Sequence, residues 1–131
     1  MIRSRVCACT RLARYQVGRA PAAVAAINRI KPAPAMVMHT GDMAHHGSIE
    51  RYRYFRELIA DLEAPFYAIP GNHDGRAPFR EAFSDTDWMP KDGTFLHYTI
   101  DDFPVRIVCC DSVRADEVTG GLCAERQDWL D

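Results

Sequence analysis

The sequence lacks the features that mark several large classes of protein. Within its 131 residues, no apolar run approaches the roughly 18–20 residues needed to span a bilayer, so we expect no membrane span. The net charge of −2 provides no basic excess, so we expect no nucleic-acid polymer as a partner. The five cysteines are an odd number and include no Cys-x-x-Cys pair, which argues against a disulfide framework or a zinc site. We therefore expect reduced thiols in a cytoplasmic protein.

Acidic residues are absent from residues 1–41, and all eighteen lie from Asp42 onward. An Arg-rich start without acids can be a transit peptide. We favour a start within the domain itself, because the stretch from Pro21 has the pattern of a packed helix. Hydrophobic residues at 47% and charged residues at 26% are typical of globular proteins, and the length suits one domain over residues 1–131.

The hydrophobic pattern of the first half predicts alternating helices and strands. Residues 21–31 predict a short amphipathic helix, and residues 35–39 predict a strand buried on both faces. Residues 49–63 predict a second helix, and residues 66–69 a second strand. The helix over residues 49–63 presents one apolar stripe, made of Tyr52, Phe55, Leu58, Ile59 and Leu62. Strand, helix and strand form a βαβ unit, whose strands end at the same sheet edge, where ligands bind in open α/β sheets.

The pattern changes to a period of two in the second half. Residues 96–100 and 105–110 alternate between apolar and polar positions and predict a β-hairpin. His97 falls on the polar side of this alternation, so we expect it to be exposed. A third helix is expected to begin near Ala124. The predicted fold class is α/β, a βαβ unit followed by a β-hairpin.

Two short polar motifs follow the predicted strands: Gly-Asp at residues 41–42 and Gly-Asn-His-Asp at residues 71–74. An aspartate such as Asp42 can bridge two divalent metals, and the carbonyl of an asparagine such as Asn72 can complete a metal's ligand shell. The glycines allow tight turns and keep side chains away from the ions. Ordinary turn formation is the alternative explanation of these residues.

Several histidines lie on or near the motifs. His73 can hydrogen-bond or protonate a phosphate oxygen, and Asp74 could accept the other N–H of that imidazole and fix its tautomer. His45 and His46, in the loop after the first motif, could reach a phosphate or serve as ligands, but we favour a solvated loop. His39 is expected to be a neutral partner within the sheet.

Taken together, the motifs resemble those of the calcineurin-like metallophosphoesterases, whose pattern includes Gly-Asp followed by Gly-Asn-His-Asp. The resemblance extends from about Pro21 to Asp131 and is closest to the bacterial branch that contains class III cyclic nucleotide phosphodiesterases and glycerophosphodiesterases. It implies a partial metallophosphoesterase α/β sandwich that hydrolyses small phosphodiesters. It also implies two divalent or transition metal ions, commonly iron, manganese or zinc.

The resemblance also implies roles for individual residues. Asp42 would bridge the two metals, Asn72 would bind the second metal, and His73 would contact the scissile phosphate. We therefore predict Asp42 and Asn72 as metal ligands and His73 and Asp74 as catalytic residues.

Other parts of the family pattern are missing. The family begins with a strand ending in Asp-x-His, but no acidic residue precedes Asp42, and the later lone histidine and Gly-His-x-His segment are also absent. Asp42 and Asn72 alone are too few ligands for two metals. We expect a fragment that lacks the first strand and the C-terminal half and hydrolyses phosphodiesters poorly. The alternative is a non-catalytic α/β remnant that binds at most one metal or a partner chain. The oligomeric state is left open.

Overall fold

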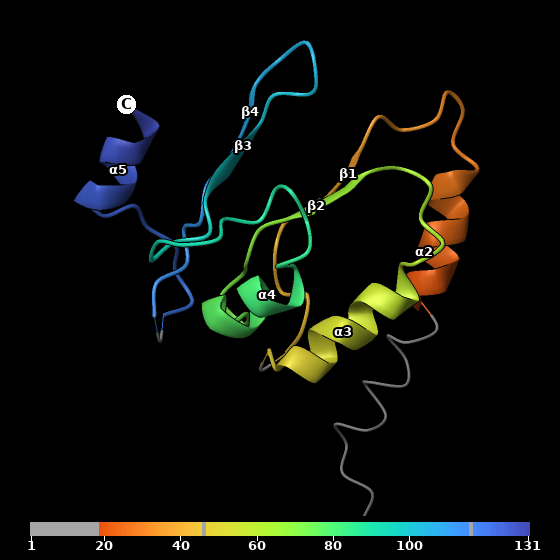
Figure 1. Cartoon of the computed structure of the whole chain (residues 1–131). Helices are drawn as coiled ribbons and strands as arrows, with labels where there is room; N and C mark the ends of the chain where they lie inside the picture. Colours follow the sequence, from red (N-terminus) through yellow and green to blue (C-terminus); the bar gives the residue numbers. More distant parts are fainter. Residues whose placement is uncertain (1–18, 46, 116) are drawn as a thin grey trace, which may run out of the picture.

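The structure, a computed structural model, describes residues 19–45, 47–115 and 117–131 (Figure 1). The acid-free start up to residue 18 and His46 lie outside this part of the chain. The described elements are α2 (Arg19–Asn28), β1 (Val37–His39), α3 (Ile49–Leu58), β2 (Phe66–Ala68), α4 (Arg76–Ala82), β3 (Tyr98–Ile100), β4 (Ile107–Cys109) and α5 (Ala124–Leu130). The fold is mixed α/β, as predicted.

The predicted βαβ unit is confirmed. β1 and β2 pair in parallel, with Val37 opposite Phe66 and His39 opposite Ala68. The pairing continues past the strand ends, where the Ile69 N–H donates to the His39 carbonyl at 3.0 Å. The residues of β1 are half-buried rather than buried on both faces, because among the described strands β1 has a neighbour on one side only.

The helices of this unit differ from their predicted bounds. α2 begins at Arg19 and ends at Asn28, and the Asn28 side chain donates to the Asp61 carbonyl at 2.8 Å. α3 ends at Leu58, earlier than the predicted residue 63, because tighter i→i+3 bonds follow, such as Leu62 N–H to the Ile59 carbonyl at 2.9 Å. Its predicted apolar stripe faces inward, with Tyr52 fully buried.

The helix α4 is an element that the sequence pattern did not predict. Its first turn contains Pro78, which a first helical turn tolerates. Phe79 and Ala82 are buried, and Phe83 follows directly after the helix. The spacing of these apolar residues at i, i+3 and i+4 is the signal that could have identified the helix.

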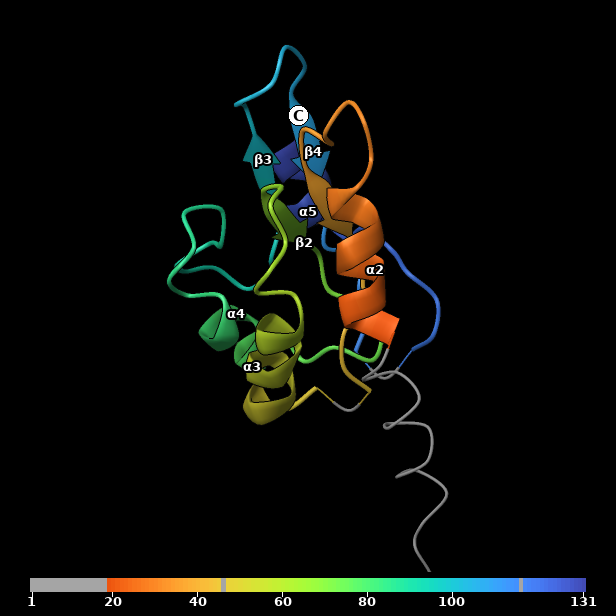
Figure 2. The same cartoon turned by 90° about the vertical axis from the view of Figure 1, so that its right-hand side faces the viewer.

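The predicted hairpin is also confirmed. β3 and β4 pair antiparallel, with Tyr98 opposite Cys109 and Ile100 opposite Ile107. α5 lies beside this hairpin (Figures 1 and 2). The expectation that His97 is exposed is wrong. Its ring is half-buried because it stacks on Trp129 of α5 at a centroid distance of 4.1 Å.

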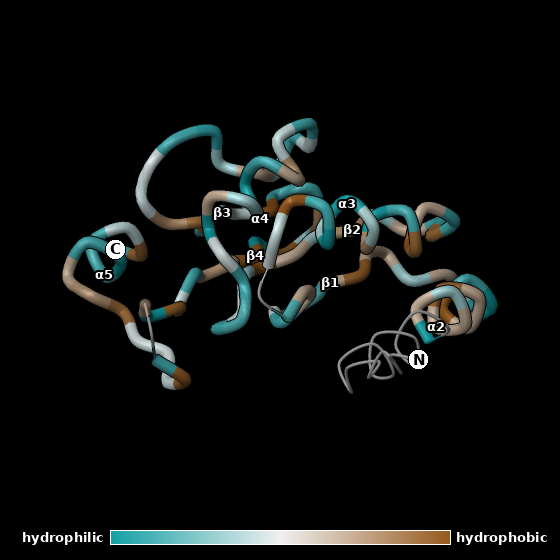
Figure 3. The backbone as a smooth tube through the Cα atoms, turned by 90° about the horizontal axis from the view of Figure 1, so that it is seen from below, coloured by the Kyte–Doolittle hydropathy of each residue, from teal (hydrophilic) through white to brown (hydrophobic). Residues whose placement is uncertain are grey.

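The core consists of two clusters that meet at Trp88. One lies under α3 and α4, and its largest members include Tyr52, Phe79 and Phe83. The other joins the hairpin to the parallel strands, where the Tyr98 hydroxyl donates to the Ala68 carbonyl at 2.8 Å. Figure 3 shows hydrophobic segments at β1 and β4 and hydrophilic stretches along several outer loops. Among the described residues, no helix is long and apolar enough to cross a membrane.

Candidate metal and phosphate site

The two polar motifs meet at the carboxyl ends of β1 and β2. Gly41 and Asp42 both have positive φ, at 114° and 57°, so the chain turns sharply after β1. A Cβ on Gly41 would lie 2.6 Å from the Gly71 Cα, and a Cβ on Gly71 would lie 2.3 Å from the Asp42 Oδ1. Glycine is therefore required at both positions for the two loops to approach this closely.

A hydrogen bond joins the motifs directly. The His73 backbone N–H donates to the Asp42 Oδ1 at 3.1 Å. Asp42, Asn72 and His73 all have exposed side chains at this edge of the molecule. The prediction that the two motifs share one sheet edge is confirmed, and three of the four predicted site residues are open to a ligand from solvent.

Asp74 occupies a different position from these three residues. It is buried, with 6% of its surface exposed, and its carboxylate accepts four hydrogen bonds. The donors are the N–H groups of Met43 (3.2 Å), Ala44 (3.2 Å) and Gly71 (2.9 Å) and the Tyr52 hydroxyl (2.9 Å). The expected hydrogen bond to the His73 imidazole is not formed, because both carboxylate oxygens are engaged by these donors. Asp74 holds the two motif loops and α3 together.

Tyr52 supports the site through Asp74, whereas the sequence pattern placed it only in the apolar stripe. Its side chain is fully buried, and a Cβ on Gly47 would lie 1.9 Å from its hydroxyl oxygen. Burial and the negative charge of Asp74 raise the pKa of Tyr52 above its ordinary value, so the hydroxyl stays protonated and donates to that carboxylate. A tyrosine within an apolar stripe indicates a buried polar partner, because a buried hydroxyl needs a hydrogen-bond partner.

Two more histidines lie near the motifs. His39 accepts a hydrogen bond from the Gly41 N–H at Nδ1 (3.3 Å), and burial lowers its pKa, in line with the expected neutral partner in the sheet. The His45 ring is exposed, as expected for a solvated loop, yet its centroid lies 4.8 Å from that of His73. His45 is therefore near enough to share a ligand with His73.

An open depression of about 400 Å³ lies beside the exposed residues Asn72 and His73, which form part of its lining. One wall is formed by residues 72–76 with Gly47, and a second wall by residues 113–115. Arg76 and Arg114 both line it, so two cationic side chains stand beside Asn72 and His73. Arg114 forms an ion pair with Glu117 at 3.0 Å.

The donor set at this edge has the right chemistry for a hard metal ion, but it is small. Asp42 offers a carboxylate and Asn72 an amide carbonyl, both exposed. Across residues 19–45, 47–115 and 117–131, no group of three or more His, Cys, Asp or Glu side chains is placed to hold a metal. The described residues therefore do not by themselves fit two metal ions.

The parallel strand pair with two touching polar loops defines an α/β domain whose candidate ligand site is at the carboxyl edge of the sheet. The chain belongs to the calcineurin-like phosphoesterase family, whose model matches residues 6–128. Members of this family generally use divalent metal ions.

Curated relatives support the same family. The chain is 41% identical over 105 residues to a probable glycerophosphodiester phosphodiesterase of Arcobacter nitrofigilis, covering 80% of this chain and 38% of that protein. It is 36% identical over 116 residues to a probable cyclic nucleotide phosphodiesterase of Rhodopseudomonas palustris, covering 86% and 41%. It is 33% identical over 104 residues to a 3',5'-cyclic adenosine monophosphate phosphodiesterase of Pseudomonas aeruginosa, covering 79% and 36%. The chain thus spans roughly two fifths of the length of these relatives.

Proposed function

We propose that this chain is part of a metal-dependent phosphodiesterase, with residues 1–131 contributing to one phosphoesterase domain. The main support is the hydrogen bond between the His73 N–H and the Asp42 carboxylate at 3.1 Å, in a chain that belongs to a phosphoesterase family. This contact brings both motifs to one exposed edge. A charged phosphodiester can reach that edge from solvent.

The residues at this edge have distinct proposed roles. Asp42 and Asn72 bind metal, together with ligands from outside the described residues. Bound metal would supply positive charge that stabilises the reacting phosphate. His73 contacts a phosphate oxygen and can hold a proton there. Asp74 acts indirectly, since its four hydrogen bonds fix the loops that carry the other three residues.

The proposed substrate is a small phosphodiester of the cyclic nucleotide or glycerophosphodiester type. The names of the relatives support this class, as does the net charge of −2, which does not favour a nucleic-acid polymer. A cytoplasmic location is part of the proposal and rests on the cysteine pattern of the sequence, an odd number without a Cys-x-x-Cys pair. Iron, manganese and zinc are the proposed metals.

A second candidate function is a non-catalytic α/β unit that binds at most one metal or a partner chain. The small donor set favours this alternative. So do exposed apolar side chains such as Val105 at 66% and Val118 at 85%, because apolar surface favours association. The two candidates differ in whether this chain turns over a phosphodiester.

The test is hydrolysis of bis(p-nitrophenyl) phosphate by the purified chain with Mn²⁺. Asp42→Asn and His73→Ala are compared with Asp61→Asn, an exposed aspartate away from the motifs. We expect both site variants to lower kcat/KM at least about 100-fold and the control to change it less than about twofold. Activity that survives both site variants would refute the proposed roles. A chain that binds Mn²⁺ without any turnover, even after the missing Asp-x-His and Gly-His-x-His segments are restored, would favour the second candidate.

A further inference from the structure

Arg76 is the first residue of α4 and is separated from the second motif only by Gly75. Its side chain makes two hydrogen bonds with a carboxylate that is distant in the sequence. Its Nε donates to the Asp111 Oδ2 at 2.6 Å, and its Nη2 donates to the Asp111 Oδ1 at 2.9 Å. The same Nη2 also donates to the Val113 carbonyl at 2.5 Å. Arg76 thereby connects the start of α4 to the segment that leaves β4, 35 residues further along the chain.

The Asp111 carboxylate is fully buried and has no spare acceptor position for solvent. Besides Arg76, it accepts the N–H groups of Leu96 at 2.9 Å and Val113 at 3.0 Å. Burial acts to raise the pKa of Asp111, but the hydrogen bonds from Arg76 and these amides outweigh it and hold the pKa below its ordinary value. The carboxylate therefore stays charged and keeps the arginine in one geometry.

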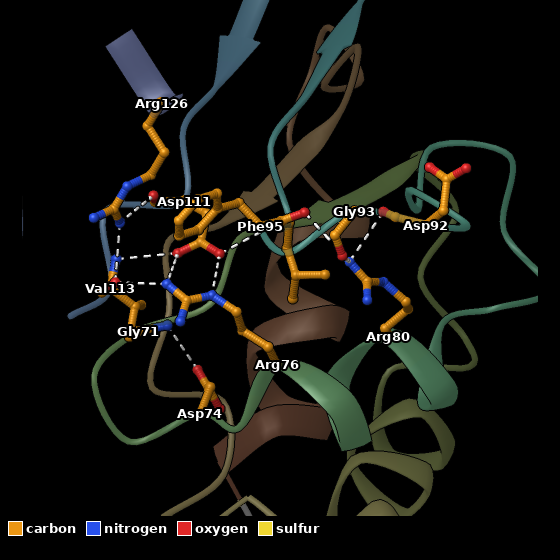
Figure 4. A network of polar contacts seen from close by, with 11 residues as sticks. Gly71, Asp74, Arg76, Arg80, Asp92, Gly93, Phe95, Asp111, Val113 and Arg126 are labelled. Carbon is orange, nitrogen blue, oxygen red and sulfur yellow. Dashed lines mark hydrogen bonds and ion pairs between the residues drawn. The ribbon is translucent and has the colours of Figure 1, made fainter. Parts of the chain in front are cut away.

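A second arginine holds the same segment from α5 (Figure 4). The Arg126 Nη1 donates to the carbonyls of Asp111 at 3.1 Å and Val113 at 3.0 Å. The Phe95 ring lies against both guanidinium groups, 4.4 Å from that of Arg126 and 5.1 Å from that of Arg76. Residues 111–113 are thus fixed by two arginines that come from different helices.

These contacts join the two walls of the depression described above. Residues 72–76 form one wall and residues 113–115 the other. We propose that Arg76 is a positioning residue: by holding Asp111, it sets the spacing between the wall that carries Asn72 and His73 and the wall formed by residues 113–115. This inference rests on the proposed function, because that spacing decides how a phosphodiester fits beside His73. The Arg76 guanidinium is engaged by Asp111 and is not itself a phosphate ligand.

Arg56 provides a control with the same hydrogen-bond geometry on a more exposed surface, where 63% of the Asp85 side chain is accessible against 0% for Asp111. This arginine also makes two hydrogen bonds to a carboxylate, that of Asp85 (2.8 Å each), donates to the Ala82 carbonyl at 2.5 Å and lies over the Phe83 ring at 5.4 Å. None of these residues lines the depression. Arg56→Lys and Arg76→Lys therefore remove the same kind of paired contact at two places, only one of which connects the walls.

Amide hydrogen exchange of the purified chain, followed by NMR without metal or substrate, tests the inference. The reporters are the Asp74 N–H, bonded to the Gly71 carbonyl at 3.0 Å, and the Gly121 N–H, bonded to the Ser112 carbonyl at 2.8 Å. We expect Arg76→Lys to speed exchange at both reporters about tenfold, the factor given by losing one charge-assisted hydrogen bond. Arg56→Lys should leave both reporters unchanged.

Two other exchange patterns would overturn the inference. One is unchanged exchange at Asp74 in Arg76→Lys. The other is faster exchange throughout the chain, including the Ile69 N–H between β1 and β2, since that would show a purely structural role. Should Arg76→Lys not fold, Arg76→Gln removes the paired contact without placing an NH₂ group against the Leu96 and Val113 N–H groups, and it is judged by the same reporters.

Kinetics with Mn²⁺ and bis(p-nitrophenyl) phosphate provide the second readout. We expect Arg76→Lys to raise KM at least about fivefold, while Arg56→Lys changes KM less than about twofold. An unchanged KM in Arg76→Lys would overturn the positioning role and leave the proposed function intact. A wild-type chain that shows no turnover even with the missing Asp-x-His and Gly-His-x-His segments restored would count against the proposed function alone, because the exchange result requires no activity.

Discussion

The buried carboxylate of Asp74 provides a sharp test of how the two motif loops are held together. In Asp74→Asn, one oxygen becomes an NH₂ group that faces hydrogen-bond donors. In the better orientation, the carbonyl keeps the Met43 and Gly71 N–H groups, and the NH₂ group faces the Ala44 N–H and the Tyr52 hydroxyl. The hydroxyl can rotate to accept, but the Ala44 N–H has no such freedom and is left without a partner.

The structure sets the size of this effect. A buried donor left without a partner costs about 1–3 kcal/mol, and hydrogen bonds to a neutral carbonyl are roughly half as strong as those to a carboxylate. We therefore expect Asp74→Asn to lower the free energy of unfolding by about 3 kcal/mol. Domains typically have a free energy of unfolding of about 5–15 kcal/mol, so this loss is a large part of it and corresponds to a fall in Tm of about 10 °C.

Urea unfolding followed by circular dichroism measures this change. The control is Asp101→Asn, because Asp101 accepts hydrogen bonds from Arg106 on an exposed surface, with 53% of its side chain accessible. An exposed ion pair contributes about 0–1 kcal/mol, so the control should lose no more than that. A loss below about 1 kcal/mol in Asp74→Asn, or a loss equal to that of the control, would refute the reasoning.

Three further predictions concern the same region. Tyr52→Phe removes the hydroxyl bonded to the buried carboxylate, and urea unfolding should show a loss of about 1–2 kcal/mol. Gly71→Ala places a Cβ 2.3 Å from the Asp42 Oδ1, so thermal melts should show a larger loss than for Gly93→Ala, where positive φ is strained but no atom lies within 4 Å. Burial lowers the folded-state pKa of His39 below 6.5, so the unfolded chain binds the proton preferentially. The free energy of unfolding should therefore fall as the pH drops below about 6.5. The urea midpoint of His39→Gln should fall less between pH 7.5 and pH 5 than that of the wild-type chain.

The patterns of the sequence determined the elements that depend on local periodicity. The apolar stripe of α3 and the alternation of the hairpin are set by which residues repeat at 3.6 or two positions, and β1 and β2 follow from short apolar runs. The polar motifs follow two strands of a βαβ unit, and right-handed crossover places both at one sheet edge. The sequence therefore predicted that Asp42 and His73 share one sheet edge, and the structure adds the hydrogen bond between them.

Tertiary structure alone decided which partner each polar group has. Asp74 stands beside His73 in the sequence, yet its carboxylate is engaged by groups of Met43, Ala44, Tyr52 and Gly71. Periodicity describes which face of an element a residue occupies, but a hydrogen bond depends on distances between elements that only packing sets. The same holds for Arg76 and Asp111, which lie 35 residues apart and meet only because the fold brings the start of α4 next to the segment after β4.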